Sequence, residues 1–298
     1  MARATTDATV VVVTYDAMPW IERCLESVGH SSVIVVDCGS RDDTVTVVRS
    51  RFPEVTVLEV ENRGLAAAWN VGLRANESRY VLLLNADAWL VGDALTRLVD
   101  FADQHPRAAI VAPRLLNPNG TLQRSVRGFP TLWRLATEYF FLRKLAPRSR
   151  LLNGFYGGSF EYDEPRPVEF VMGACMLVRR DAVKQVGYLD EEYFLFSEET
   201  DWCFRFRAAG WQVVFYPAAE CVHVGGASHA GRLYRENLRG HLLFFWKHRG
   251  RKQAEWARRI LLAGARLRCV LYPGERGRTY RDAARWLASG DVATLIAR

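Results

Sequence analysis

Short apolar runs alternate with amphipathic segments through the first 115 residues. Val10–Thr14 is a run of β-branched residues, typical of a strand covered on both faces of a parallel sheet. Further strands are predicted at Val33–Val36, Val55–Val60, Tyr80–Leu84 and Ala109–Ala112, and helices at Pro19–Val28, from Asp42 onward, at Leu65–Ala75 and at Asp93–Gln104. This alternation predicts βαβ units with right-handed crossovers, and therefore an α/β fold with a mostly parallel, Rossmann-like central sheet flanked by helices.

The pattern changes after Pro113. The turn sequence at Asn117–Gly120 predicts a hairpin. Beyond it we expect an aromatic-rich amphipathic stretch at Thr131–Leu145 and an apolar segment at Val168–Val178 that is broken by Gly173. We expect a helix at Glu198–Ala209, a strand at Gln212–Tyr216 and two basic helices in the C-terminal tail. We therefore predict one domain over residues 1–235, with halves 1–115 and 116–235, followed by a helical extension over 236–298.

Composition is that of an ordinary globular protein, with 49% apolar and 24% charged residues. The longest apolar runs are far too short to cross a bilayer. No signal-length apolar stretch follows a basic N-terminal region. The six cysteines are scattered and form no C-x-x-C pair, which disfavours a zinc site or a disulfide framework and fits reduced thiols. We expect a cytoplasmic protein.

The net charge of +7 is distributed unevenly along the chain. From Arg232 onward there are 16 Lys and Arg against 5 Asp and Glu, a net +11, whereas the preceding 231 residues hold 24 against 28, a net −4. Such a tail could meet nucleic acid, an anionic membrane surface or a phosphorylated substrate, and the alternative is a solvated helical face. One face of the second tail helix is predicted to be apolar: Trp256, Ile260, Ala263, Leu267 and Leu271. That face predicts either a peripheral contact with the inner face of the membrane or packing on the catalytic domain or a second subunit, as in a homodimer. We do not expect nucleic acid as a partner.

Polar residues follow four consecutive predicted strands. They are Thr14, Tyr15 and Asp16; Asp37; Asn62, Arg63 and Gly64; and Asn85, Ala86 and Asp87. Because ligands of open parallel sheets bind at the carboxyl ends of the strands, these residues predict one edge of a binding crevice. The sequence has no G-x-G-x-x-G after the first strand and no P-loop, which disfavours a dinucleotide or a nucleoside triphosphate held in a glycine cradle.

Each polar strand end admits a binding and a structural interpretation. Asp37 could accept hydrogen bonds from a nucleobase or a ribose hydroxyl, or cap a turn. Asp87 is a hard oxygen ligand that could share Mg²⁺ or Mn²⁺ with a diphosphate, or be a turn residue. Arg63 could pair with phosphate or be a surface charge. Asn62 and Asn70 could support the same loop or cap the helix at Leu65–Ala75.

A second cluster lies far downstream. Glu198, Glu199 and Asp201 fall within four residues beside aromatic side chains. Acids at the start of a helix ordinarily interact with the helix dipole. In an adjacent pair flanked by apolar rings, however, the like charges and partial burial raise the pKa of one carboxylate, which is how a carboxylate is poised as a general base. His223 ends another extended segment and could ligate the same metal, contact a diphosphate, or be a buried or capping histidine.

Taken in this order, the segments resemble family 2 glycosyltransferases of the GT-A fold over roughly Thr9 to His248. Six segments carry the resemblance: Val10–Asp16, Val36–Thr44, Glu61–Leu65 with Asn70, Leu84–Asp87, Phe194–Trp202 with Arg205 and Gly210, and His223–Ser228. Their order along the chain is a stronger signal than any one of them alone.

The resemblance implies an inverting transferase that binds a nucleotide-sugar donor and a hydroxyl acceptor. The family's metal-binding aspartate maps to Asp87, its D-x-D element being reduced here to Asn85-x-Asp87. Its nucleotide-binding aspartate maps to Asp37, in the turn with Gly39. Its general base falls on Glu199, where the family usually has aspartate, so Glu198 and Asp201 remain alternatives.

The segment around Gly173 and the residue Trp202 are expected on the acceptor side. The local pattern, including the segment Val171–Arg180 and the residues Arg232, Asn237, Lys247 and His248, looks most like rhamnosyltransferases. These typically use dTDP-L-rhamnose and act on glycan, lipid-linked or natural-product acceptors. Neither a Q-x-x-R-W motif nor a membrane span is present in the sequence, which argues against a processive synthase. Two rival hypotheses are a nucleotidyltransferase built on the same α/β half and a non-catalytic nucleotide-sugar-binding module.

Overall fold

A computed structural model describes residues 7–225 and 232–297, which divide into two compact units. Unit 1 holds residues 7–126, 161–194 and 199–225 of that part, and unit 2 holds 127–160, 195–198 and 232–297. This division differs from the predicted one, because the segment 127–160 groups with the C-terminal helices instead of the α/β domain.

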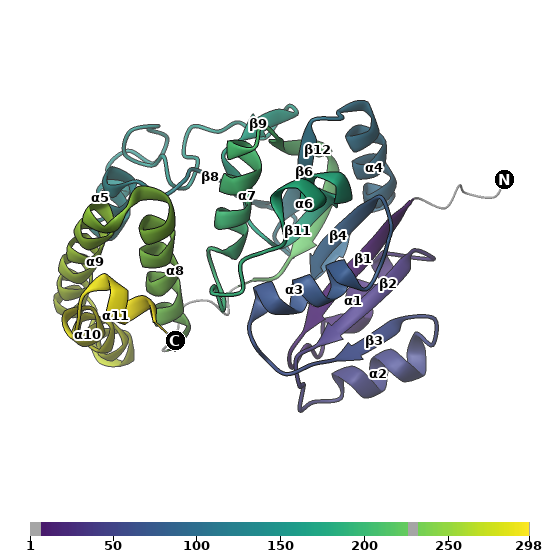
Figure 1. The fold of residues 1–298 in the computed structure, drawn as a ribbon, viewed down its shortest axis with the longest axis horizontal. Coiled ribbons are helices and arrows are strands. Elements are labelled where there is room, and N and C mark those ends of the chain that lie inside the picture. The colour runs from purple at the N-terminus through teal and green to yellow at the C-terminus, as the bar shows by residue number, and fades with distance from the viewer. Residues whose placement is uncertain (1–6, 226–231, 298) are drawn as a thin grey trace. The chain divides into compact units, whose positions relative to one another are not determined.

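The first four long strands of unit 1 form a parallel array in the order β3-β2-β1-β4 (Figure 1). They are β1 (Ala8–Thr14), β2 (Ser32–Asp37), β3 (Thr56–Glu59) and β4 (Tyr80–Asn85). The register sets Thr14 beside Asp37 and Val13 beside Asn85. The predicted polar strand ends therefore lie along one edge of the sheet, as the sequence indicated.

The rest of the sheet is mixed. β11 (Cys175–Arg179) runs antiparallel between β4 and β6 (Ala108–Leu116), and β12 (Gln212–His223) runs parallel to β6. Short strands β5 (Ala88–Leu90), β7 (Leu122–Gln123) and β9 (Arg166–Val168) pair antiparallel at its margins. Two further short strands are β8 (Val126–Arg127) and β10 (Phe170–Val171). The α/β prediction is confirmed, and so is the hairpin at Asn117–Gly120, which joins β6 to β7.

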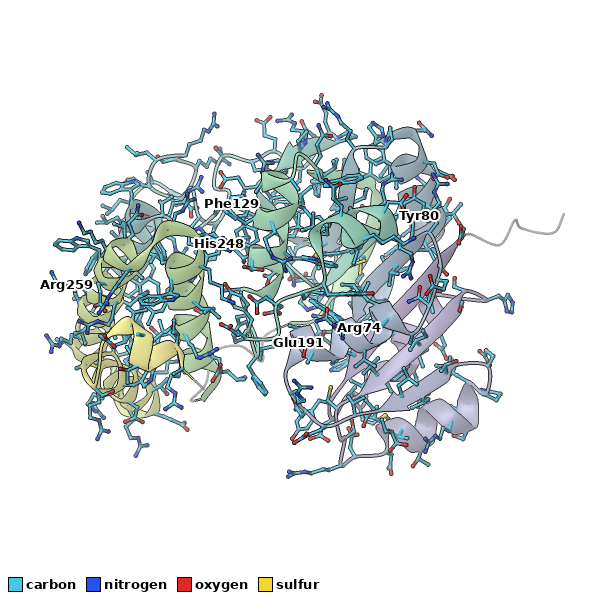
Figure 2. All side chains as sticks on the ribbon, in the orientation of Figure 1. Arg74, Tyr80, Phe129, Glu191, His248 and Arg259 are labelled. Carbon is cyan, nitrogen blue, oxygen red and sulfur yellow. The ribbon has the colours of Figure 1, made fainter. Side chains whose placement is uncertain are left out.

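Helices cover both faces of the sheet because the strands are apolar on both sides. Val10 and Val12 share one buried cluster with residues of α1 (Ile21–Ser27) and α4 (Ala94–Gln104). Val11 points the other way, toward α3 (Leu65–Arg74), where a Cβ on Gly72 would collide with it. The remaining helices of this part are α2 (Thr44–Arg51), α6 (Arg180–Val186) and α7 (Glu198–Ala208). Tyr80 anchors the start of β4 by donating its hydroxyl to Asp103 at 2.6 Å (Figure 2).

Unit 2 is helical. The bounds of its helices are α5 (Leu132–Tyr139), a 3₁₀ turn η1 (Leu142–Lys144), α8 (Arg232–Arg249), α9 (Arg251–Leu271), α10 (Gly274–Ala288) and α11 (Val292–Ile296). The prediction of two tail helices was wrong, since four lie within residues 232–297. Gly250, at a φ of 82°, separates α8 from α9, and Pro273 precedes α10. No helix in the described ranges is both long and apolar enough to span a membrane.

The core of unit 2 is formed by aromatic side chains and by small residues of α9 that let the helices pack closely. The rings of Phe129 and Phe244 are stacked with their centroids 6.3 Å apart, and the centroids of the Phe244 and His248 rings lie 4.9 Å apart (Figure 2). α9 packs against α5, α8 and α10. Its buried residues are Ala254, Ala257, Leu261, Gly264, Ala265 and Arg268. The apolar face predicted from sequence is a different one, and Trp256 and Leu271 on it are exposed.

Candidate active site

The turn after β2 is built around the carboxylate of Asp37, which is 1% exposed. Its Oδ2 accepts the backbone N–H groups of Gly39 and Ser40 at 3.0 and 2.9 Å. Its Oδ1 accepts the hydroxyls of Thr14 and Ser40 at 2.8 and 2.5 Å. Four donors match the four acceptor positions of a carboxylate. This geometry favours the interpretation of Asp37 as the residue that shapes the turn over a direct contact with a nucleotide.

The loop after β1 is tied to the same turn. Asp16, at a φ of 50°, accepts the backbone N–H of Arg41 at 2.6 Å, and its own N–H donates to the Ser40 hydroxyl. One residue further on, Asp42 accepts the N–H of Met18 at 3.0 Å. The two loops therefore form one braced surface at the carboxyl ends of β1 and β2, and Tyr15 lies half-exposed upon it.

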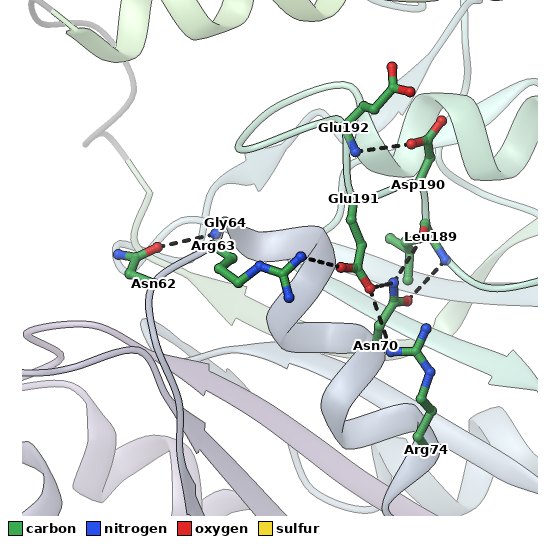
Figure 3. A network of polar contacts seen from close by, with 9 residues as sticks. All are labelled: Asn62, Arg63, Gly64, Asn70, Arg74, Leu189, Asp190, Glu191 and Glu192. Atoms are coloured by element: carbon green, nitrogen blue, oxygen red, sulfur yellow. Dashed lines mark hydrogen bonds and ion pairs between the residues drawn. The ribbon is translucent and has the colours of Figure 1, made fainter. Parts of the chain in front are cut away.

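The loop after β3 is held by an amide and a glycine. Asn62 Oδ1 accepts the N–H of Gly64, which adopts a φ of 103° (Figure 3). A Cβ at Gly64 would collide with the Phe194 carbonyl, which also accepts the N–H of Leu65 at 2.7 Å. Gly64 is therefore required by both its conformation and this close approach.

Asn70 and Glu191 connect α3 to the segment that leads into the acidic cluster. Asn70 is fully buried, and its side chain donates to the Leu189 carbonyl and accepts the Leu189 N–H, at 2.9 and 3.0 Å (Figure 3). Glu191 accepts from Asn70 and forms looser ion pairs with Arg63 and Arg74, at 3.4 and 3.5 Å. This placement favours a supporting role for Asn70. The Arg63 side chain is 67% exposed, so it still has surface to offer a phosphate.

Asp87 and His223 come together at the same edge of the sheet, because β5 pairs with β12 and sets Ala88 opposite His223. Asp87 Oδ1 lies 3.4 Å from His223 Nε2, and Asp87 Oδ2 accepts the N–H of Gly225 at 3.0 Å. The rest of the predicted histidine motif, Gly226 to Ser228, lies outside the described residues.

Gln123 determines how the imidazole is presented. Its amide N–H₂ donates to the His223 carbonyl at 3.0 Å, which leaves its Oε1 to accept the His223 Nδ1–H at 2.7 Å. The Nε2 atom, which faces Asp87, then carries a lone pair unless the ring takes up a second proton. A carboxylate oxygen and an imidazole lone pair that face one another at this distance suit a shared cation. Sequence reasoning missed Gln123, since nothing in the hairpin sequence marks it.

Asp87 is predisposed to be ionised. Burial raises the pKa of Asp87, but when the imidazole carries its second proton the hydrogen bond and the charge of His223, together with the N–H of Gly225, outweigh burial and hold that pKa below its ordinary value. No group of three or more His, Cys, Asp or Glu side chains that could hold a metal occurs in residues 7–225 and 232–297. Within those residues, Asp87 Oδ1 and His223 Nε2 are the pair that could serve as ligands of a divalent metal.

Glu199 lies beside the glycine that precedes β11. A Cβ on Gly173 would be 3.6 Å from Glu199 Cβ and 2.9 Å from the ring of Trp69. The absence of a side chain at Gly173 therefore lets Glu199 and Trp69 approach the start of β11. Ala174 accepts the N–H of Asn85 at 3.0 Å, which connects this point to the strand end that carries Ala86 and Asp87.

The other two acids are placed differently. Asp201 is 1% exposed and forms an ion pair with Arg205 Nε at 2.7 Å, one helical turn away in α7. Glu198 is buried and groups with unit 2. Trp202 is fully buried and donates its indole N–H to the Gly187 carbonyl at 2.9 Å. These contacts favour a structural role for Asp201 and a packing role for Trp202, and they leave Glu199 as the best-placed of the three candidate bases.

The turn before the acids is strained, which the sequence did not reveal. Phe196 and Ser197 both have φ values of 70°, a conformation that is rare for residues with side chains. Within unit 2, Gly240 of α8 lies against this turn, where a Cβ would be 2.7 Å from Ser197 Oγ and 2.9 Å from the Phe196 carbonyl. Such strain concentrates at functional sites.

The sequence of residues 9–187 matches the model of glycosyl transferase family 2. An N-acetylglucosaminyl-diphospho-decaprenol L-rhamnosyltransferase of Mycobacterium tuberculosis is 33% identical over 231 residues, 72% of this chain and 75% of that protein. The chain belongs to glycosyltransferase family 2. A low-salt glycan biosynthesis hexosyltransferase, Agl10 of Haloferax volcanii, is 22% identical over 236 residues, 73% of this chain and 67% of that protein.

Solved structures confirm the GT-A fold of this glycosyltransferase. GalNAc-T7, crystallised with UDP, GalNAc and Mn²⁺, superposes with a TM-score of 0.59 at 13% identity, over 94% of this chain and 55% of that one. TarS of S. aureus superposes with a TM-score of 0.51 at 16% identity, over 86% of this chain and 42% of that one. The chain thus spans about half the length of these structures, and the likeness concerns the fold alone.

Proposed function

We propose that this glycosyltransferase transfers L-rhamnose from dTDP-L-rhamnose to a hydroxyl of a glycan, lipid-linked or natural-product acceptor, with inversion at the anomeric carbon. The family membership and the 33% identity to a rhamnosyltransferase support the sugar. That relative's name describes a polyprenyl-diphosphate-linked acceptor, and we extend the same acceptor class to this chain as part of the proposal.

The observation that carries the proposal is the meeting of three groups at one sheet edge. The Asp87–His223 pair, the Asn85 strand end and the Gly173–Glu199 contact are linked through Ala174 and β11. We propose that an electrophile held at the first group lies within reach of the Glu199 carboxylate of α7. A donor site and a base at opposite sides of one reaction centre are what a single displacement requires.

Glu199 is the proposed general base. Its carboxylate removes the proton from the acceptor hydroxyl as that oxygen forms its bond to the anomeric carbon. The bond between the anomeric carbon and the β-phosphate oxygen breaks in the same step, and the electron pair leaves with the nucleoside diphosphate. The acceptor oxygen enters on the face opposite the leaving group, so the configuration at the anomeric carbon inverts.

Asp87 and His223 would hold a divalent metal, Mg²⁺ or Mn²⁺. Such an ion supplies positive charge that stabilises the departing diphosphate. Gln123 fixes the imidazole orientation for this role, and the Gly225 N–H holds the Asp87 carboxylate. Arg63 is the proposed phosphate contact.

The braced turns after β1 and β2 are the proposed nucleoside site. Asp37 and Asp16 hold the backbone of Gly39, Ser40 and Arg41 in place, and Thr14 and Tyr15 adjoin it. We propose that the nucleoside is recognised by this rigid surface and not by the Asp37 carboxylate, whose acceptor positions are filled.

We further propose a cytoplasmic location with a peripheral contact at the inner face of the membrane. The basic tail supports it, and so does the exposure of Trp256 and Leu271 on the predicted apolar face. A homodimer through that face is the competing proposal.

A donor panel tests the function. Thermal unfolding is followed with dTDP-L-rhamnose, UDP-glucose and GDP-mannose, each with Mn²⁺ or with chelator, and release of nucleoside diphosphate is measured in parallel. We expect dTDP-L-rhamnose with Mn²⁺ to raise the melting temperature most and to be hydrolysed slowly. Binding without any hydrolysis or transfer would favour a non-catalytic module, and preference for another nucleotide would reject the donor.

A further inference from the structure

The segment that follows α5 in unit 2 is a compact loop fixed by its own contacts. Asn153 donates its side-chain N–H₂ to the Pro147 carbonyl at 2.7 Å. The Ser149 hydroxyl accepts the N–H groups of Leu151 and Leu152, both at 3.2 Å. Gly158 is buried against Asn153 and Pro147, where a Cβ would collide. These contacts hold the loop in a defined shape.

Large apolar side chains point out of this loop. Leu145 is 77% exposed and Leu151 is 66% exposed. Trp133 of α5 is 47% exposed and donates its indole N–H to the Leu151 carbonyl at 2.8 Å, which fixes the indole beside Leu151. Exposed large apolar groups gathered on a rigid loop indicate a surface that is covered in use.

The loop carries a net positive charge. Residues 139–160 contain four basic residues and no Asp or Glu. Two of them are engaged, Arg143 by an ion pair with Glu138 and Lys144 over the ring of Phe141 at 4.8 Å. Arg148 and Arg150 are exposed, and neither has an ion-pair partner in the part of the chain that the structure describes. Cations beside exposed leucines and a tryptophan match the interface of an anionic bilayer.

We propose that Trp133, Leu145 and Leu151, with Arg148 and Arg150, form a membrane-contact surface that inserts its apolar side chains among the headgroups of anionic phospholipids. This assigns a membrane contact to the loop after α5, a part of the chain separate from the basic tail. The surface exists whatever the reaction is, and it rests on the proposed function only in that a lipid-linked acceptor would be presented there.

Vesicle co-sedimentation of the full-length protein tests the assignment. The vesicles are phosphatidylcholine with phosphatidylglycerol, or phosphatidylcholine alone. The loop variant is Leu145→Ser with Leu151→Ser, and a second variant, Trp256→Ser with Leu271→Ser on α9, tests the proposed tail contact separately. Because all four side chains are exposed, thermal unfolding should be unchanged in both variants.

We expect the wild type to sediment with the anionic vesicles only, and the loop variant to lose about tenfold or more in partitioning. Loss in the loop variant supports the assignment whether or not the tail variant also weakens. Undiminished binding of the loop variant, or no binding of the wild type, would overturn it. So would a wild-type dimer in solution that the loop substitutions convert to a monomer.

Release of dTDP from dTDP-L-rhamnose, measured without vesicles, separates this proposal from the proposed function. The loop variant should hydrolyse the donor at the wild-type rate. Failure of the wild type to hydrolyse or transfer any donor would reject the proposed chemistry. The vesicle experiment would still decide whether the loop binds membranes, because it does not depend on the reaction.

Discussion

The two units of this glycosyltransferase differ in charge and in how they use it. Over the described residues, unit 1 carries 17 Lys and Arg against 26 Asp and Glu, a net −9, whereas unit 2 carries 21 against 7, a net +14. In unit 1 the acids lie at strand ends and hold loops and a candidate metal site. In unit 2 only two of the described Lys and Arg side chains are buried, Arg239 and Arg268, and Arg268 donates to the Tyr139 carbonyl at the end of α5. The comparison suggests that chemistry belongs to the acidic unit, and attachment to anionic surfaces belongs to the basic one.

The largest effect should come from the candidate base of unit 1. Glu199→Gln keeps the size of the side chain but cannot take a proton, so transfer should fall about 10²- to 10⁴-fold. Donor binding, measured by calorimetry, should stay within about twofold of wild type. Asp201→Asn is the matched control, because it breaks the ion pair with Arg205 and should cost stability while sparing the turnover of the folded protein. Full activity of Glu199→Gln would move the base to Glu198 or Asp201.

A stability effect should mark unit 2. His241 is buried against Phe155 and Tyr139, and burial lowers its pKa from 6.5 to about 4. The unfolded chain then takes up a proton at a pH where the folded chain does not. Stability should therefore be lost as the pH falls from 6.5 toward 4, by about 3 kcal/mol for this residue.

Denaturant unfolding at several pH values measures that loss. In His241→Phe, the loss of unfolding free energy between pH 6.5 and pH 4 should be smaller by about this amount, because phenylalanine has nothing to protonate. An unchanged loss in the variant would show that His241 does not report on the folding of unit 2.

The smallest effect should come from a substitution in unit 2 that acts on the turn before Glu199. Alanine in place of a helix glycine usually stabilises by about 1 kcal/mol, but a Cβ at Gly240 would push on the Phe196–Ser197 turn. Glu199 follows that turn by two residues, so Gly240→Ala should lower kcat about tenfold and leave donor affinity unchanged. Adding Ser197→Gly removes two of the three close contacts and suits the φ of 70°, so the double variant should recover.

Gly264→Ala is the control for that experiment. Its Cβ would meet Tyr139 Cβ at 2.6 Å, inside the same helical unit, and the three nearest atoms all belong to Tyr139 and none to the turn. It should therefore lower the melting temperature without changing the kcat of the folded protein. Equal kcat losses in both variants would mean that unit 2 supports catalysis only by being folded.

The sequence was sufficient for the parallel half of the sheet and its polar edge, because each strand is a self-contained apolar run and each polar residue directly follows one. It could not supply β5, which has three residues, or the Gln123–His223 contact, which joins residues 100 positions apart. The hydrogen-bond partners of Asp37 could not be predicted either. The sequence placed Asp37 in its motif, but only the structure shows that Thr14, Gly39 and Ser40 donate hydrogen bonds to its carboxylate oxygens. The sequence left open whether the apolar face of the tail helix is buried, because small residues such as Ala254, Ala257 and Gly264 do the packing of α9 and helical periodicity does not single them out.

The central claim is that Asp87 and His223 share a cation that holds the donor diphosphate. Calorimetric titration of dTDP into the wild type and Asp87→Asn, with Mn²⁺ and with chelator, tests it most directly. We expect the wild type to bind dTDP at least about tenfold more tightly with Mn²⁺ than without it, and Asp87→Asn to lose that difference. Wild-type affinity that is the same with and without the metal, or a metal effect that survives in Asp87→Asn, would contradict the claim.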